Sequence, residues 1–169
     1  MNIYEIIKMI KEDKQCEVYV PCGEPMMRKE DKLPDDIKVF YELCGGIRFF
    51  KGSKFEFIVV PPNEVILANP VIIGELCEED ISSKWYIICK DLEENYITFD
   101  SSVERNGRCY DSFWDRHGVV GECAVVALSF SELLINLYKS KGEQLFWLAD
   151  SFKNLGDAYD NNVCEKSVL

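Results

Sequence analysis

Histidine, cysteine and paired carboxylates are the residue types whose spacing could support catalysis or metal binding in this chain. The 169 residues include one histidine, His117, in the segment Asp-Arg-His-Gly, and eight cysteines, no two of which are closer than six residues. A nucleophilic enzyme needs a base beside its cysteine or serine, whereas a single histidine next to a glycine is typical of a solvated turn. The cysteines contain no Cys-x-x-Cys spacing, which argues against a zinc knuckle or a redox pair.

Motifs for phosphate, metal and nucleophile sites are also missing from the sequence. No P-loop, no dinucleotide-binding glycine pattern and no nucleophile elbow occurs. The acidic stretch that begins at Asp91 resembles the start of an EF-hand loop, but it lacks the glycine and the final glutamate that such a loop requires. We therefore expect no catalytic residue, no metal and no cofactor. The alternative is a small hydrolase that uses a cysteine or a carboxylate pair.

The net charge of −11 excludes some classes of partner. Nucleic-acid binding needs clustered Lys and Arg side chains for the phosphates, and an acidic protein is repelled by an anionic membrane surface. The apolar runs are far shorter than the roughly 20 residues that span a bilayer, and the amino-terminal segment lacks the continuous apolar region of a signal peptide. We expect a cytoplasmic protein whose cysteines are reduced thiols, most of them in the core.

The negative charge is concentrated in residues 71–100, which contain eight acidic side chains and two lysines. This segment is either a solvated face that maintains solubility or an electrostatic face for a basic partner, with aromatic anchors and charged rim residues. For the second interpretation, the candidate binding residues are Glu78, Glu79, Asp80, Trp85, Asp91, Glu93, Glu94 and Asp100, together with Arg105, Arg108, Asp111 and Trp114.

Helical patterns occur near both ends of the chain. Isoleucines at helical spacing predict a helix over residues 3–10, and residues 17–21 read as a short extended piece. A second helix is expected from Leu33-Pro34 to residue 44, with Gly45-Gly46 as a left-handed cap. A capping box at residues 129–132 predicts the start of a third helix, which ends near Gly142.

Strand patterns fill the middle of the chain. Alternation predicts a strand near residues 55–59, followed by a short helix over 63–69. Further strands are expected at residues 85–90, 96–100, 103–105, 108–113 and 124–128. Asn106-Gly107 predicts a type I′ turn.

This order of elements indicates one α+β domain over residues 1–169, with a mostly antiparallel central sheet flanked by N-terminal and C-terminal helices. Its polar end, residues 155–169, is expected to fray.

Four segments, in their order along the chain, resemble the SUKH superfamily of Smi/Knr-like domains. LPDDIKVFYELCGG at residues 33–46 is similar to that family's Leu-Pro helix, which ends in a glycine-containing turn. PNEV at residues 62–65 resembles the short helix after a strand, and the two runs within residues 85–100 resemble a strand pair that ends in an aspartate. SFSELL at residues 129–134 is similar to the family's final helix. The resemblance is strongest over residues 33–140.

The resemblance implies a non-enzymatic protein-binding domain of the bacterial immunity-protein type. Such proteins neutralise polymorphic toxins, many of which are nucleases, whereas fungal relatives are linked to cell-wall regulation. The charge agrees with the first role, because a nuclease presents a basic groove with which an acidic protein associates rapidly. We expect an antitoxin whose partner is a basic toxin domain, a nuclease. The alternative is a regulatory or scaffold module for a host protein.

Overall fold

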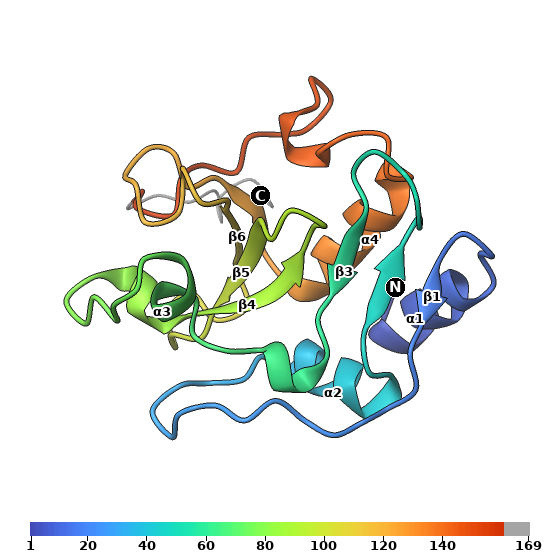
Figure 1. Cartoon of the computed structure of the whole chain (residues 1–169), viewed down its shortest axis with the longest axis horizontal. Helices are drawn as coiled ribbons and strands as arrows, with labels where there is room; N and C mark the ends of the chain where they lie inside the picture. The colour runs from blue at the N-terminus through green and yellow to red at the C-terminus, as the bar shows by residue number, and fades with distance from the viewer. Residues whose placement is uncertain (161–169) are drawn as a thin grey trace.

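A computed structural model describes residues 1–160 of the chain. Within these residues, seven strands form one sheet whose spatial order follows the chain, as a meander (Figure 1). Every pair of neighbouring strands is antiparallel. The strands are β1 (Glu17–Val18), β2 (Ile47–Phe49), β3 (Phe57–Val59), β4 (Trp85–Lys90), β5 (Tyr96–Asp100), β6 (Cys109–Ser112) and β7 (Val125–Ala127).

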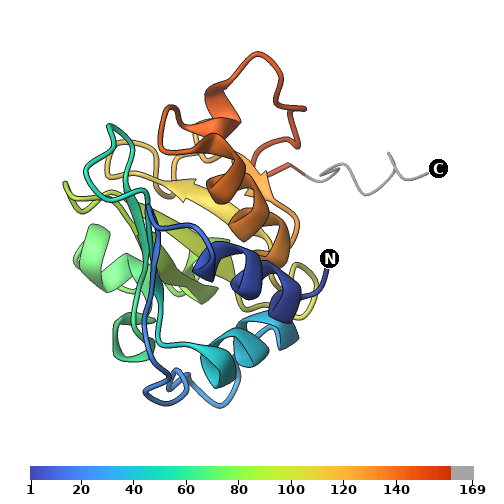
Figure 2. The same ribbon diagram turned by 90° about the vertical axis from the view of Figure 1, so that its right-hand side faces the viewer.

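Of the four α-helices in residues 1–160, three cover one face of the sheet. They are α1 (Ile3–Lys11), α2 (Asp35–Leu43) and α4 (Phe130–Ser140), and Figure 2 shows them on the side opposite α3 (Ala68–Ile72). The connections contain the short 3-10 helices η1 (Pro62–Glu64), η2 (Ile81–Lys84) and η3 (Phe146–Leu148). The expected α+β class with an antiparallel sheet is confirmed.

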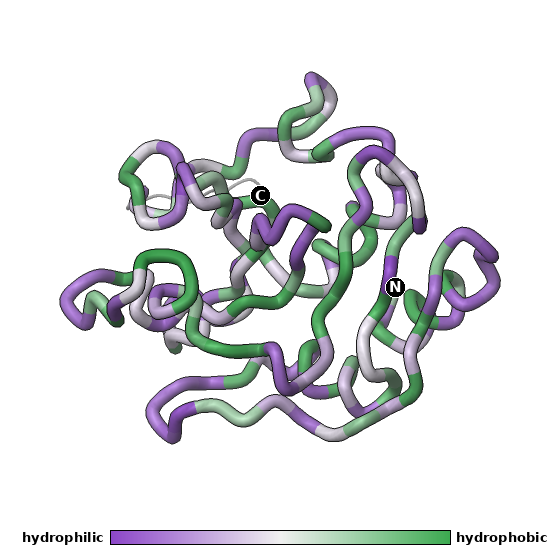
Figure 3. Tube along the Cα trace, viewed as in Figure 1, coloured by the Kyte–Doolittle hydropathy of each residue, from purple (hydrophilic) through white to green (hydrophobic). Residues whose placement is uncertain are grey.

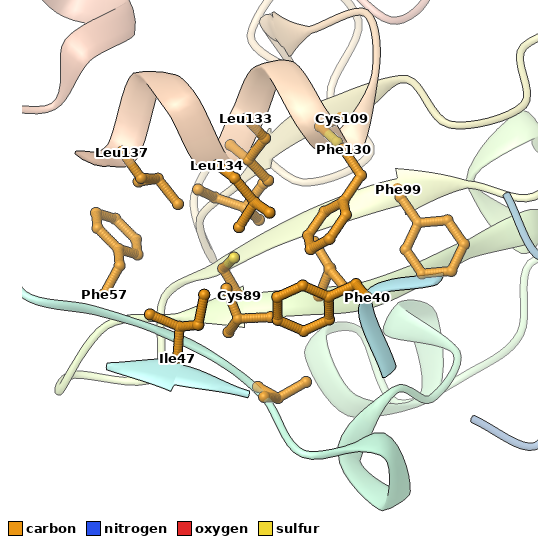
Figure 4. Packing of buried hydrophobic residues seen from close by; sticks show 14 of the residues in the cluster. Phe40, Ile47, Phe57, Cys89, Phe99, Cys109, Phe130, Leu133, Leu134 and Leu137 are labelled. Atoms are coloured by element: carbon orange, nitrogen blue, oxygen red, sulfur yellow. The ribbon is translucent and has the colours of Figure 1, made fainter. Parts of the chain in front are cut away.

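The larger hydrophobic core lies between the sheet and these three helices. The isoleucine stripe of α1 is buried there, as its spacing predicts. The ring centroids of Phe40 of α2 and Phe130 of α4 are 5.0 Å apart, and Figure 4 shows the two rings beside each other in the same cluster as the strand residues Ile47 and Cys89. Each fully buried side chain of this size contributes roughly 1.5–3 kcal/mol, so this layer is the main source of stability.

Side-chain caps fix where the helices of this layer begin. Asn2 and Glu5 form a reciprocal capping box at the start of α1. At α4, the hydroxyl of Ser129 accepts from the Glu132 N–H at 3.2 Å, as expected, but the Glu132 carboxylate accepts from the Leu128 N–H rather than from Ser129. The capping box predicted at residues 129–132 is therefore only half formed.

The short helix expected at residues 63–69 is displaced in the structure. η1 ends at Glu64, and α3 begins only at Ala68. The residues between them are extended because they lie along β4: the Ile66 carbonyl accepts from the Ile87 N–H at 2.9 Å. Pairing with a neighbouring strand thus interrupts the helix.

Residues 103–105, expected as a strand, belong to the turn between β5 and β6. Asp100 closes this turn, because its carboxylate accepts from the Ser102 N–H at 2.9 Å and its carbonyl accepts from the Gly107 N–H at 2.9 Å. Gly107 has φ +88°, but Asn106 is not left-handed, so the expected type I′ turn does not form.

The chain after α2 forms β2, a strand that the sequence pattern did not predict. Cys44 is extended, so the left-handed cap expected at Gly45-Gly46 is absent at Gly45. A Cβ at Gly45 would lie 2.2 Å from the Val20 carbonyl oxygen, and this close approach requires glycine. Gly46, at φ +133°, then turns the chain into β2.

The opposite face of the sheet carries a smaller core, in which the rings of Trp85 and Tyr110 lie 4.3 Å apart. Residues 155–160, expected to fray, pack here: the Gly156 carbonyl accepts from the Val125 N–H at the edge of β7. The rest of the expected frayed segment, residues 161–169, lies outside the described residues. Figure 3 shows hydrophobic segments along the inner strands and hydrophilic segments mainly in peripheral loops.

Candidate partner-binding surface

The acidic residues of segment 71–100 form two clusters rather than one face. The α3 cluster, between α3 and η2, consists of Glu75, Glu78, Glu79 and Asp80. The turn cluster, between β4 and β5, consists of Asp91, Glu93 and Glu94. The 3-10 helix η2 and the six residues of β4 separate them, and the extended strand alone spans roughly 17 Å. The two clusters are thus distinct features of the surface.

Asp80 is the member of the α3 cluster that is partly buried and hydrogen-bonded. Its Oδ2 accepts from the Ser82 N–H at 2.9 Å, from the Ser82 hydroxyl and from the Tyr159 hydroxyl at 2.7 Å. Burial raises the pKa of Asp80, but these hydrogen bonds outweigh it and lower the pKa below its usual value. Asp80 therefore ties η2 to residues 155–160, whereas the three glutamates of the cluster are exposed.

The turn cluster is organised by Asp91. Its Oδ1 accepts from the Glu93 N–H at 2.9 Å and from the Asn95 N–H at 2.8 Å. Glu94 occupies the left-handed position of the turn, at φ +61°, and both glutamates are exposed. A cavity of about 300 Å³ beside the turn is lined by Asp91, Glu93 and also Lys54. Lys54 offsets part of the negative charge at this end of the sheet.

Three of the residues expected to bind a partner are buried: Trp85, Asp100 and Asp111. Asp100 accepts from Trp85 Nε1 at 3.1 Å and from the Tyr110 hydroxyl at 2.7 Å. Asp111 accepts from Trp147 Nε1 at 3.0 Å and pairs with Arg116. Because these side chains face the two cores, they do not reach a partner while the chain is folded. Alternation along the strands shows which residues share a face, but not that both faces are covered.

The remaining candidates lie nearer the surface. Arg105 is half-buried and donates from Nε to the Asp100 carboxylate at 3.0 Å, so its first role is to neutralise a buried charge. Arg108 is partly exposed beside this turn. Trp114 is 79% exposed and lies near the start of the loop of residues 113–122, which is the setting expected of an aromatic anchor.

His117, expected in a solvated turn, is instead buried, with 4% of its surface exposed. Its Nε2 lies 2.5 Å from Asn69 Oδ1, and the Asn69 amide nitrogen donates to the Leu76 carbonyl and to Ser82 Oγ. Because that amide already donates twice, we assign the imidazole proton to Nε2. Burial lowers the pKa of His117 to about 4, against the opposing effect of the Asp80 charge. The ring is therefore neutral at pH 7.

The surroundings of the cysteines and of His117 give no support to nucleophilic chemistry. The imidazole is hydrogen-bonded to an amide and forms a T-shaped contact with the Trp85 ring. Five of the seven cysteines in residues 1–160 are buried, and burial raises the pKa of the Cys44 thiol to about 11 and that of Cys123 to about 12.

Over the described range, no group of three or more His, Cys, Asp or Glu side chains could hold a metal ion. No helix among residues 1–160 is long and apolar enough to cross a membrane.

Exposed aliphatic side chains lie beside the α3 cluster, and the sequence pattern did not single them out. They are Val71 and Ile73 near the end of α3, and Val119 and Val120 in the loop. A Cβ at Gly118 would lie 3.7 Å from Ile73 Cδ1, so the loop and the end of α3 are in contact. The only signal in the sequence is the pair of valines after His-Gly, which a core strand could equally contain.

Sequence comparison shows the class of protein to which this fold belongs. Residues 31–136 match the SMI1 / KNR4 family (SUKH-1), and the chain is a member of that family. The chain is also 47% identical over 160 residues to the protein named Immunity protein YokJ of Bacillus subtilis (strain 168), and the match covers 95% of this chain and 97% of that protein. No solved structure matches the chain. The family match includes both acidic clusters and the loop of residues 113–122.

Proposed function

We propose that this chain is an immunity protein that neutralises a toxin domain by binding it. The observation that carries the proposal is the 47% identity to Immunity protein YokJ, which extends over nearly the full length of both chains. Membership of the SUKH-1 family supports the same role. A match of this extent includes the surface loops as well as the core, and specificity resides in such loops rather than in the fold.

The partner is a basic toxin domain, and we propose that it is a nuclease. A nuclease needs cationic side chains to bind phosphate, and the exposed glutamates of the α3 and turn clusters complement such a surface. Opposite charges of this kind raise the rate of association more than they raise affinity. The chain thus competes with the phosphate backbone without contacting nucleic acid or a membrane.

The protein acts without catalysis and in the cytoplasm. Its histidine is hydrogen-bonded to Asn69, and its buried thiols are protonated at neutral pH because burial raises their pKa values. The unpaired state of the described cysteines suits a reducing compartment. Neutralisation therefore rests on occupying the toxin's surface.

Growth rescue and binding kinetics test this function. The probe is a basic nuclease toxin domain, sought first among secreted proteins encoded near this chain's gene. Co-expression of the chain restores growth. Charge reversal by Glu93→Lys together with Glu94→Lys slows association about threefold to tenfold at low salt and flattens the salt dependence of the association rate. Glu12→Lys with Glu143→Lys, which changes the net charge equally at exposed positions outside both clusters, is the matched control.

The alternative function is that of a regulatory or scaffold module that binds a host protein. It predicts no rescue from the toxic domain, and association with a housekeeping protein at a rate that depends little on salt. Rescue by the wild-type chain together with a salt-dependent association rate rejects this alternative. Toxicity that the chain does not relieve, with no binding, contradicts the immunity role.

A further inference from the structure

Apolar and acidic side chains are interleaved on one surface of the molecule, formed by the end of α3, the segment that follows it, and the loop of residues 113–122. We call it the α3–loop surface. Its exposed apolar members include Ile73, Val119 and Val120, the last of which is 73% exposed. Exposed apolar groups that gather within a rim of charge are a mark of protein–protein contact.

The rim of the α3–loop surface is acidic. Three exposed glutamates of the α3 cluster follow Ile73, and Asp115 and Glu122 are exposed at the two ends of the loop. The loop's one cation, Arg116, pairs with the buried Asp111 and also lies 3.8 Å from Asp115, so it offsets part of the charge of Asp115 but none of the charge of the three glutamates. A partner that fits must present cations around an apolar patch, because apolar contact alone would leave the carboxylates unpaired.

Buried hydrogen bonds beneath the α3–loop surface fix its position. His117, buried directly before Gly118-Val119, is hydrogen-bonded through Nε2 to Asn69 of α3. The Asn69 amide in turn donates to the Leu76 carbonyl at 2.8 Å, which fixes the segment after the helix. His117 Nδ1 is buried and has no hydrogen-bond partner among the described residues. A surface fixed before binding loses less conformational entropy when the partner arrives.

The turn cluster differs from the α3–loop surface in each of these respects. It exposes one apolar side chain, Leu92, and the structure places Lys54 beside its carboxylates. The conformation of the turn is fixed by hydrogen bonds within the turn, from its backbone N–H groups to the Asp91 carboxylate. Its charge therefore acts at long range, by attracting a cationic partner before contact.

We propose that the toxin domain docks on the α3–loop surface, with its apolar patch over Ile73, Val119 and Val120 and its cations on the surrounding glutamates, while the turn cluster only steers the encounter. This inference rests on the proposed function, because it names the surface through which that function is carried out. The partner is a folded basic protein domain, whose apolar patch must lie between its cations.

Dissociation rates separate docking from steering. The experiment measures association and dissociation of the same toxic domain on the full-length chain. Val119→Ser with Val120→Ser raises the dissociation rate about tenfold, the effect of losing roughly 1.4 kcal/mol of contact, with little change in association. Leu92→Ser, an equally exposed apolar site on the turn, leaves the dissociation rate within about twofold.

Charge reversal supplies the second comparison. Glu78→Lys with Glu79→Lys slows association and raises the dissociation rate, whereas Glu93→Lys with Glu94→Lys slows association alone. Thermal melting confirms that each variant is folded, and Trp114→Ala gives an independent variant within the loop. Equal dissociation rates for the loop variants and the wild type, or a larger effect at Leu92, overturn the docking surface. Absence of binding by the wild type instead overturns the proposed function.

Discussion

The Asp100 carboxylate has no exposed surface, and four groups donate hydrogen bonds to it. It accepts from Trp85 Nε1, the Tyr110 hydroxyl, Arg105 Nε and the Ser102 N–H. A buried charge is tolerated only when it is paired in this way, and removing it leaves its partners without an acceptor. Asp100 is therefore a structural residue of the smaller core, in spite of its place in the acidic segment.

Asp100→Ala should lower the free energy of unfolding by about 3–5 kcal/mol, because a buried indole, a phenol and a guanidinium lose their acceptor. Urea denaturation at pH 7 measures the loss. Glu104→Ala, at an exposed position of the same turn, should change stability by less than about 0.5 kcal/mol. A loss below about 1 kcal/mol for Asp100→Ala would contradict the role of the carboxylate as a hub.

His117 should make stability depend on pH. Its folded pKa of about 4 lies below the ordinary value of 6.5, because burial disfavours the charged ring. The unfolded chain therefore takes up a proton that the folded chain refuses, and stability falls as the pH drops from about 6.5 toward 4. Between pH 7 and pH 5 the wild type should lose about 2 kcal/mol more than His117→Gln.

His117→Gln keeps a donor for Asn69 but does not titrate, so the difference between the two proteins isolates the ring. Asp80, whose lowered pKa keeps it charged at pH 5, lies near position 117 in both proteins. Parallel stability curves for wild type and variant over this range would show that the imidazole titrates normally and is not buried as described.

At the scale of elements, long strands with strong patterns were predictable and short paired ones were not. The bounds expected for β4 and β5 match the structure residue for residue. β2 has three residues next to two glycines, and only its pairing with β1 and β3 makes it a strand. Residues 103–105 have strand-forming neighbours, but the hydrogen bonds of Asp100 fold them into a turn. Tertiary contacts override local propensity in both cases.

Gly45 tests the contact between the chain after β1 and the end of α2. Gly45→Ala should cost about 2–3 kcal/mol, because the new Cβ would meet the Val20 carbonyl oxygen, which is backbone and has no room to move. Gly52→Ala is the control: it has φ +82° and no atom near its Cβ, so only the left-handed conformation costs, about 1 kcal/mol. A smaller loss at Gly45 than at Gly52, measured by denaturant titration, would refute the close approach.

At the scale of the whole molecule, the net charge and its concentration in residues 71–100 were readable from composition. Its division into two clusters was not, because a strand within the segment carries its two flanks to opposite ends of the sheet. The apolar half of the α3–loop surface was equally hidden, because the exposure of Val119 and Val120 is visible only in the folded loop. A single sequence shows which residues are charged or apolar, whereas the fold decides which of them meet.

The central claim is that binding by this chain is sufficient to silence a toxin. The most direct measurement adds purified chain stepwise to the purified toxin domain used for the binding experiments and follows the nuclease activity that we propose for it. We predict that activity falls linearly to zero at a one-to-one ratio and that the inhibition weakens as salt is raised, because acidic side chains cover a basic surface. Full activity at a large molar excess of the chain would contradict the claim.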